Sequence, residues 1–355
     1  MRRRRVVVGV AAVLVVALLA VAAVVGVGWW RDSRRTDLAR ALDLAAPAER
    51  YSFTDWAGVR RALDVPDDAG TDARTLRRML DDGYDADLTS ASALEGSAEL
   101  LRARYGWSPA DLDWELLAQA EDGVLVVAAL GEDTDVDDLA DRLAGLGYER
   151  PGEDDGVWRG GEELVARISA QSGLTGSPVL QYVALDADAG VVRTSDSAAY
   201  LEAVLAGDLG APEEVDDVVG AAGDALSAAV YTGRHACTAL AMSQADEIDQ
   251  ASAEQLVEQA GGVSPVRAYA MAVRPARDLV VAMSFEDGER ARRNADARAV
   301  LAAGPAPGQG GAFTDRFELG DVSADDGLVR LDLDPVDGAS VFSDLSTGPV
   351  LFATC

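Results

Sequence analysis

The most pronounced hydrophobic pattern in the chain is an unbroken apolar run near its start, from Val6 to Trp30. Its 25 residues exceed the roughly 20 that an α-helix needs to cross the core of a bilayer. The run ends in Trp29 and Trp30, and paired tryptophans suit a membrane interface. The pattern predicts a transmembrane helix over residues 6–30, with the lipid bilayer as its partner, after a basic tail of residues 1–5.

The charges on either side of this run indicate its orientation. Arg2–Arg5 precede it, whereas Asp32 and Asp37 lie among the arginines that follow it. Basic residues favour the cytoplasmic side, so we expect a cytoplasmic tail 1–5 and a single-pass protein of the cell membrane whose soluble portion is extracytoplasmic. A cleaved signal peptide is the alternative, because Ala20-Val21-Ala22 has small residues at the cleavage spacing. No Cys ends the run, which excludes a lipidated cysteine there.

Residues 31–120 have a helical pattern and are interpreted as a juxtamembrane and helical region. Thr54 and Thr71 stand where helices would begin, and Ser108 is followed by Pro109 at a first helical position. The helix predicted after Ser108 would carry Leu112, Leu116 and Leu117. This region is therefore expected to be built from helices.

The hydrophobic pattern changes at Val124, after which predicted strands alternate with predicted helices. Val124–Leu130 is predicted to be a buried strand, followed by a helix that opens at Thr134 and ends at Gly147. A further strand is predicted near Leu164–Ile168. Phe313–Leu319 and Leu328–Leu333 are predicted as two final strands.

A tripeptide recurs in this part of the chain. Ser177-Pro178-Val179, followed by Tyr182, reappears as Ser264-Pro265-Val266, followed by Tyr269. Each copy opens an apolar segment, a turn, a second apolar segment and a helical pattern, which indicates a duplication.

We therefore predict an α+β fold with an N-terminal transmembrane helix, a helical segment and two related strand, hairpin and helix units. The units would span residues 121–212 and 213–355, and the second would include the C-terminal strands. Their sheets would be antiparallel or mixed, with helices on one face.

Charge and composition exclude several classes of function. The chain has 31 basic and 61 acidic residues, for a net charge of −30, and every basic residue is Arg. A surface this negative repels phosphate backbones, so nucleic acid is not an expected partner. The lack of Lys excludes a phosphate-binding-loop lysine and a Schiff-base lysine. Scarce Lys, Asn and Ile indicate a high-GC genome.

The two cysteines are Cys237 and Cys355, the last residue of the chain. In an exported protein an even number of cysteines predicts a disulfide, here one that would pin the C-terminus. Two unpaired thiols are the alternative.

No catalytic, cofactor-binding or metal-ligating residue emerges from the motifs. His235 is the only histidine, and it is interpreted as structural or exposed. Asp133, Asp135 and Asp137 resemble the start of a calcium loop, but Asp138 stands where that loop needs Gly. These acids are instead expected to favour a helix N-terminus. No cofactor is predicted.

In its layout the chain resembles uncharacterised exported proteins of high-GC actinobacteria. The resemblance rests on the N-terminal run, on Ser52-Phe53-Thr54-Asp55-Trp56-Ala57-Gly58-Val59-Arg60-Arg61 and on the acidic α+β region. It implies a location at the cell envelope, and no activity or site residue.

The leading functional hypothesis is a membrane-tethered extracytoplasmic module without enzymatic activity that binds an envelope protein or a cell-wall component. One alternative is a carboxylate-dependent hydrolase of the cell envelope, which needs two facing acids, one of them with a raised pKa. Another is an adhesion or sensor module that depends on a divalent cation.

Overall fold

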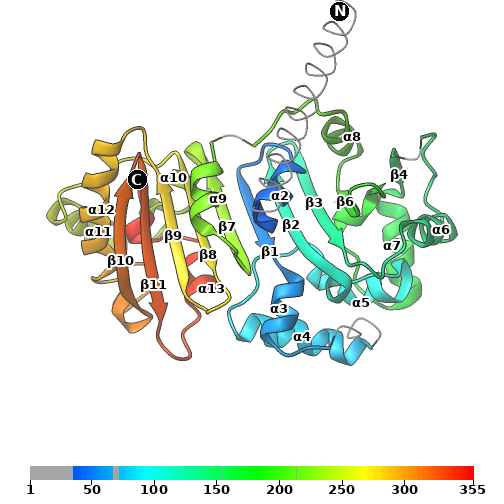
Figure 1. Ribbon diagram of the computed structural model, residues 1–355, viewed down its shortest axis with the longest axis horizontal. Coiled ribbons are helices and arrows are strands. Elements are labelled where there is room, and N and C mark those ends of the chain that lie inside the picture. The colour runs from blue at the N-terminus through cyan, green and yellow to red at the C-terminus, as the bar shows by residue number, and fades with distance from the viewer. Residues whose placement is uncertain (1–34, 67–71, 154, 213) are drawn as a thin grey trace, which may run out of the picture. The chain divides into compact units, whose positions relative to one another are not determined.

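Within the residues that the structure describes, all strands join one continuous antiparallel sheet of 11 strands (Figure 1). The structure is a computed structural model that describes residues 35–66, 72–153, 155–212 and 214–355. Across the sheet the order is β10-β11-β9-β8-β7-β1-β2-β3-β6-β5-β4. In chain order the strands are β1 (Arg50–Thr54), β2 (Leu112–Ala120), β3 (Gly123–Leu130), β4 (Val157–Arg159), β5 (Tyr182–Asp186), β6 (Val191–Ser195), β7 (Ser227–Thr232), β8 (Ala268–Val273), β9 (Leu279–Ser284), β10 (Phe317–Asp325) and β11 (Leu328–Pro335).

Helices pack on both faces of this sheet. The larger core lies under α3 (Trp56–Ala62), α4 (Ala73–Asp85), α5 (Ala98–Leu100), α6 (Val136–Leu146), α7 (Gly161–Ser172), α10 (Gly233–Ala239), α11 (Glu247–Gln259), α12 (Gly288–Ala302) and α13 (Val341–Leu345). The smaller core, on the other face, lies under α2 (Asp37–Asp43), α8 (Ala198–Ala206) and α9 (Asp216–Ala222). Residues 37–355 form one unit.

The pattern of buried and accessible residues along each strand shows whether helices cover one or both of its faces. All residues of β8 and β9 are buried, because helices cover both of their faces. In β11 buried and accessible residues alternate, and along most of β10 partly buried residues alternate with exposed ones, as expected for strands with one face on a core and the other toward water. The sheet is therefore bare on one side at this end.

The predicted pair of related units, each with its own sheet, is wrong. β1 pairs with β2 on one side and with β7 on the other, so it joins both halves into one sheet. β1 comes from the region predicted to be helical. A strand of five residues carries a weak local signal, and its partners lie far away in sequence.

The strands that follow the two copies of the repeated tripeptide pair differently in the two halves of the sheet. In the first half β3 pairs with β6, the second strand of the following hairpin. In the second half β7 pairs with β8, the first strand of its hairpin. The two segments therefore have different strand pairings, and the similarity of their sequences does not extend to topology.

Two element assignments from the sequence are corrected as well. The residues after Ser108 form a short 3₁₀ turn at Pro109–Asp111 and then β2, so Leu112, Leu116 and Leu117 belong to a strand. Leu164–Ile168 lies within α7 rather than in a strand. In both segments apolar residues are too closely spaced for periodicity alone to separate helix from strand.

The predicted transmembrane helix over residues 6–30 and the basic tail 1–5 lie outside the described residues. None of the helices in the described part of the chain is both long and apolar enough to cross a membrane.

Candidate functional site

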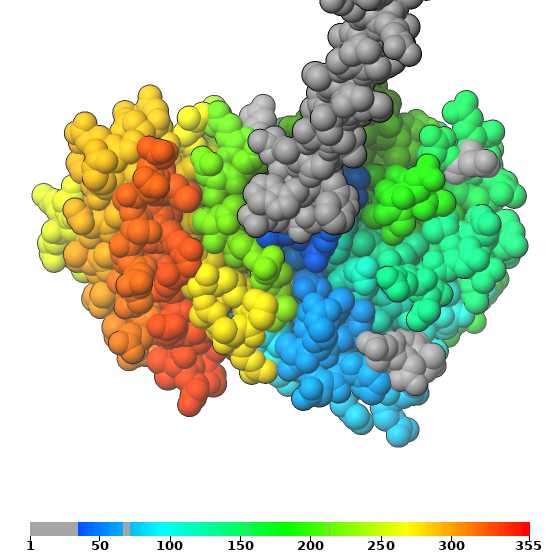
Figure 2. All heavy atoms as spheres, in the orientation of Figure 1, coloured from blue at the N-terminus to red at the C-terminus, as the bar shows by residue number. Residues whose placement is uncertain are grey.

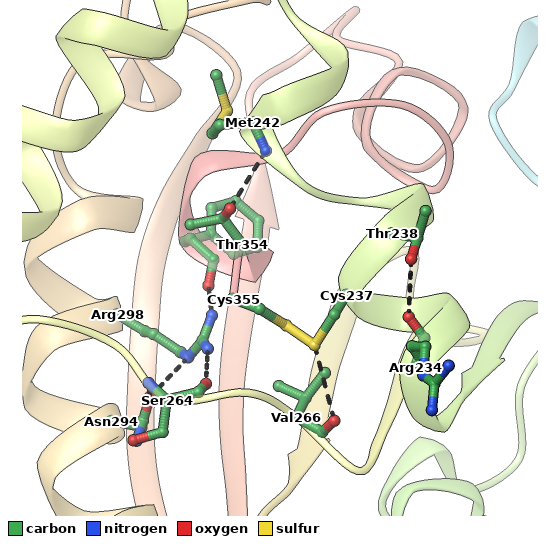
Figure 3. The surroundings of a disulfide bond; sticks show 11 residues. Arg234, Cys237, Thr238, Met242, Ser264, Val266, Asn294, Arg298, Thr354 and Cys355 are labelled. Atoms are coloured by element: carbon green, nitrogen blue, oxygen red, sulfur yellow. Dashed lines mark hydrogen bonds between the residues drawn. A yellow bond between two sulfur atoms is a disulfide. The ribbon is translucent and has the colours of Figure 1, made fainter.

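The C-terminus is fastened to the domain by a disulfide between Cys237 of α10 and Cys355 (Figure 3). The two Cα atoms lie 5.3 Å apart, and neither cysteine of the chain is free. The predicted disulfide is therefore present. It closes a loop with a sequence separation of 118 residues.

Arg298 of α12 holds the same C-terminal segment from inside the core (Figure 3). Its side chain is 0% exposed, and burial lowers the pKa of its guanidinium to about 9. Nη1 donates to the carbonyl oxygen of Phe352 at 2.6 Å and Nη2 to that of Ser264 at 2.9 Å. Nε donates to Oδ1 of Asn294. Because these are charge-assisted bonds in a buried site, Arg298 has a structural role in docking the chain end.

A buried carboxylate lies at the centre of the sheet. Glu115 of β2 is 2% exposed and accepts hydrogen bonds from Trp56 Nε1 at 3.1 Å and from Ser92 Oγ at 2.8 Å. Burial raises the pKa of Glu115 to about 7, against the opposing effect of these donors. Glu115 thus titrates near neutrality without contact with solvent.

The segment between α4 and β2 ties three central strands together around this carboxylate. The backbone N–H of Ser90 donates to Thr54 Oγ1 of β1, and its hydroxyl donates to the carbonyl of Ala228 in β7. Ser92 bonds to Glu115 of β2. This segment therefore crosses the junction between the two halves of the sheet.

Other acids noted in the sequence serve helix ends. Asp135 is the N-cap of α6, where its side chain accepts from the backbone N–H of Asp137. In the described residues no group of three or more His, Cys, Asp or Glu side chains is arranged to hold a metal ion.

Asp87 caps the short helix α13 from a distant part of the chain. Its carboxylate accepts from the backbone N–H groups of Phe342 and Ser343 and from the hydroxyl of Ser343. Burial raises the pKa of Asp87, and these hydrogen bonds oppose that shift. Its acceptor positions are occupied by protein donors, so its role in this structure is architectural.

His235 lies on α10 beside a shallow hollow at the ends of β1 and β7. Its Nδ1 is 3.6 Å from Oε2 of Glu49, and its ring stacks on Tyr231 with centroids 5.9 Å apart. No Ser or Cys side chain is among the residues that line this hollow.

Helices leave one side of β10 and β11 open, and we name it the β10–β11 face (Figures 1 and 2). Its members are Glu318, Ser323 and Asp325 of β10 and Arg330, Asp332 and Asp334 of β11. On the opposite side β11 buries Val329, Leu331 and Leu333 in the larger core, and β10 buries Phe317 there. The β10–β11 face thus presents polar and charged side chains on a rigid support.

At one end this face continues into a hollow, which we name the Asp334 hollow. Its cavity volume is about 440 Å³. The charged residues of its lining are mainly acidic: Asp85, Asp87, Asp278, Asp334 and Asp337, with Arg277 as the basic member, and the other lining residues are apolar or glycine. Asp332 and Asp334 come together with Glu318 on one surface only through the pairing of β11 with β10 and β9.

Comparisons with known proteins add little. No protein-family model matches the chain, and no curated protein sequence matches it. A solved structure described as crystal form I of TP0453 aligns with a TM-score of 0.37 and 7% identity, over 86% of this chain and 96% of that one. A likeness this distant carries no argument about fold or function.

Proposed function

We propose that this protein is an extracytoplasmic binding module, held at the cell membrane by the apolar sequence of residues 6–30, that binds an envelope protein or cell-wall component through the β10–β11 face. The observation that carries the proposal is the bare, charged side of two long strands whose other side is buried. A partner can lie against such a face without any rearrangement of the core.

The disulfide supports the proposed location outside the cytoplasm. Disulfides persist in oxidising environments outside the cytoplasm and are rare inside it. The structure contains such a bond, between Cys237 and Cys355. An envelope location gives this bond the redox conditions that it needs.

The roles of Glu115 and Asp87, two of the carboxyls whose pKa is raised, favour binding over hydrolysis at these two residues. An acid-base hydrolase needs two carboxyl groups that both reach the substrate. Glu115 is enclosed by its hydrogen-bond donors, and Asp87 is occupied by the N-terminus of α13. The structural roles of Glu115 and Asp87 thus explain why these two carboxyls are buried and have raised pKa values.

The test of location uses the absence of Lys from the chain. We expect a lysine introduced at exposed Gln255 of α11 to be labelled in intact cells by an amine reagent that does not cross membranes. The unchanged chain is the blank. Labelling of Q255K only after lysis would contradict an extracytoplasmic location.

The test of binding places a photo-crosslinking amino acid at exposed Ser323 on the β10–β11 face, in the full-length chain in its own membrane. The same amino acid at Gln255, on the helix-covered side, is the control. We expect one reproducible adduct from position 323 and none from position 255. Equal capture at both positions, or none at 323, would rule out this face as the binding surface.

A further inference from the structure

Two carboxylates on the β10–β11 face stand directly opposite each other. The register pairs Glu318 of β10 with Asp334 of β11, and both residues are exposed. Like charges directly opposite each other on neighbouring strands destabilise a sheet. Neither residue has an ion-pair partner in the part of the chain that the structure describes. The fold thus retains an unfavourable arrangement at the solvent-facing side of β10 and β11.

Other acids nearby are already neutralised by arginines of the same chain. Asp332 accepts from Arg330 at 2.8 Å and from Arg274 at 3.3 Å, and Arg274 also pairs with Asp278. The acids on and beside the face are therefore of two kinds. Asp332 on the face and Asp278 beside it are paired with arginines, whereas Glu318 and Asp334 have no ion-pair partner among the described residues.

The open pair leads into the Asp334 hollow. Asp334 belongs to both the face and the hollow, and Val336, at 45% exposed, lines the same hollow. A long basic side chain has an aliphatic stem and a cationic head. In the hollow the stem can pack on Val336 while the head lies near Asp334 and Asp337.

The size of the face argues for a chain rather than a single ion. β11 has eight residues, which corresponds to roughly 26 Å of extended strand. Phosphate-bearing ligands are disfavoured because the net charge of the protein is −30. Charge complementarity selects a cationic partner of extended shape.

We propose that the β10–β11 face binds an arginine- or lysine-rich segment of a partner protein, which lies along β10 and β11 and places one basic side chain in the Asp334 hollow. This inference rests on the proposed function and adds the chemistry of the partner.

The test measures binding of a fluorescent peptide of alternating arginine and serine to the full-length chain in detergent, by fluorescence anisotropy. A peptide of alternating glutamate and serine is the control ligand. The variant E318Q/D334N removes two charges from the face. The matched variant E254Q/E258Q removes two charges from exposed positions of α11 on the helix-covered side.

We expect E318Q/D334N to weaken binding of the arginine peptide about tenfold, because two exposed ion pairs are lost. E254Q/E258Q should bind like the unchanged chain, and added salt should weaken binding by all three proteins. Unfolding curves of the variants confirm that each is folded.

Equal weakening by both variants would overturn the inference, because the overall negative field of the protein would then explain binding. Loss of peptide binding in the presence of calcium at concentrations that leave ionic strength unchanged would also overturn it, in favour of a cation site. If position 323 captures a partner but the arginine peptide does not bind, the inference fails and the proposed function stands. If the peptide binds but position 323 captures nothing, the proposed function fails.

Discussion

Glu115 shows how opposing local effects set the charge of one residue. Burial favours its neutral form, whereas donors from Ser92, Trp56 and the backbone of Ala93 favour its carboxylate, and the charge of Glu95 opposes ionisation further. The balance raises the pKa from 4.5 to about 7. Because the group lies between the central strands, its protonation state is coupled to the stability of the fold.

A pH-dependent contribution to stability follows from this shift. A carboxyl group whose pKa is raised on folding stabilises the folded state while it is protonated, so its contribution is complete below pH about 4.5 and is lost as the pH rises through about 7. The shift corresponds to about 3 kcal/mol. Relative to the unchanged chain, E115Q should therefore gain up to about 3 kcal/mol between pH 4 and pH 8.

The measurement is urea unfolding of both proteins across this pH range. Other acids with raised pKa values, such as Asp55 and Asp87, contribute equally to both chains and cancel in the difference. A constant offset between the two curves would show that Glu115 has the same pKa in the folded and unfolded states.

At the scale of elements, the last hairpin illustrates what a sequence pattern can and cannot predict. The strand predicted at Leu328–Leu333 lies within β11, whereas the one predicted at Phe313–Leu319 overlaps β10 only from Phe317 to Leu319 and begins in a 3₁₀ turn. The register was not predictable. A bulge between Leu319 and Val322 shifts the pairing, and only this register sets Glu318 opposite Asp334.

The opposed carboxylates should limit the stability of this hairpin. Replacing them with E318Q/D334N removes a like-charge contact, so the free energy of unfolding should rise by a few tenths of a kcal/mol at neutral pH and low salt. The gain should shrink in high salt, where exposed charges are screened. Unfolding in urea at two salt concentrations measures both effects.

Asp332 provides the contrasting control. D332N removes an acid that accepts hydrogen bonds from Arg330 and Arg274, so it should lower stability rather than raise it. If E318Q/D334N lowers stability as much as D332N does, Glu318 and Asp334 have favourable partners within the protein. They would then not be open to a basic partner on the β10–β11 face.

At the scale of the whole molecule, two interactions hold the C-terminus on the domain: the disulfide and the hydrogen bonds of the buried Arg298. The aromatic ring of Phe352 also packs on Phe313 and Phe317, with centroids 5.0 and 6.2 Å away. The disulfide acts chiefly on the unfolded chain, which it restricts, whereas Arg298 acts on the folded one.

Removal of the two interactions should therefore differ in outcome. C237S/C355S should lose about 2–5 kcal/mol of stability, yet keep its near-ultraviolet circular dichroism, because the tail remains bonded to Arg298. R298M should keep the disulfide but leave the carbonyl of Phe352 without its donor, so we expect local loss of protection in hydrogen exchange over residues 350–355. Loss of the near-ultraviolet signal in C237S/C355S would show that the disulfide alone holds the tail.

Strand partners explain why the fold was only partly predictable. The sequence predicted two adjoining units. Local periodicity cannot show that the five residues of β1 pair both with β2 and with β7, which begins at Ser227, far along the chain. The candidate surface was missed for the same reason. Glu115 also escaped notice, although an acid inside the apolar stretch Leu112–Ala118 is a detectable signal, because that stretch was interpreted as a helix.

The sequence by itself determined the features that depend on composition or on a few neighbouring residues. These are the acidic charge, the absence of Lys, the even cysteine count and the end of α6 at Gly147. Tertiary structure alone decided the strand order, the side of the sheet that stays bare and the register that opposes Glu318 to Asp334. The physical reason is that hydrogen bonds between strands, and the burial that follows from them, join residues far apart in the chain and are selected by the whole fold.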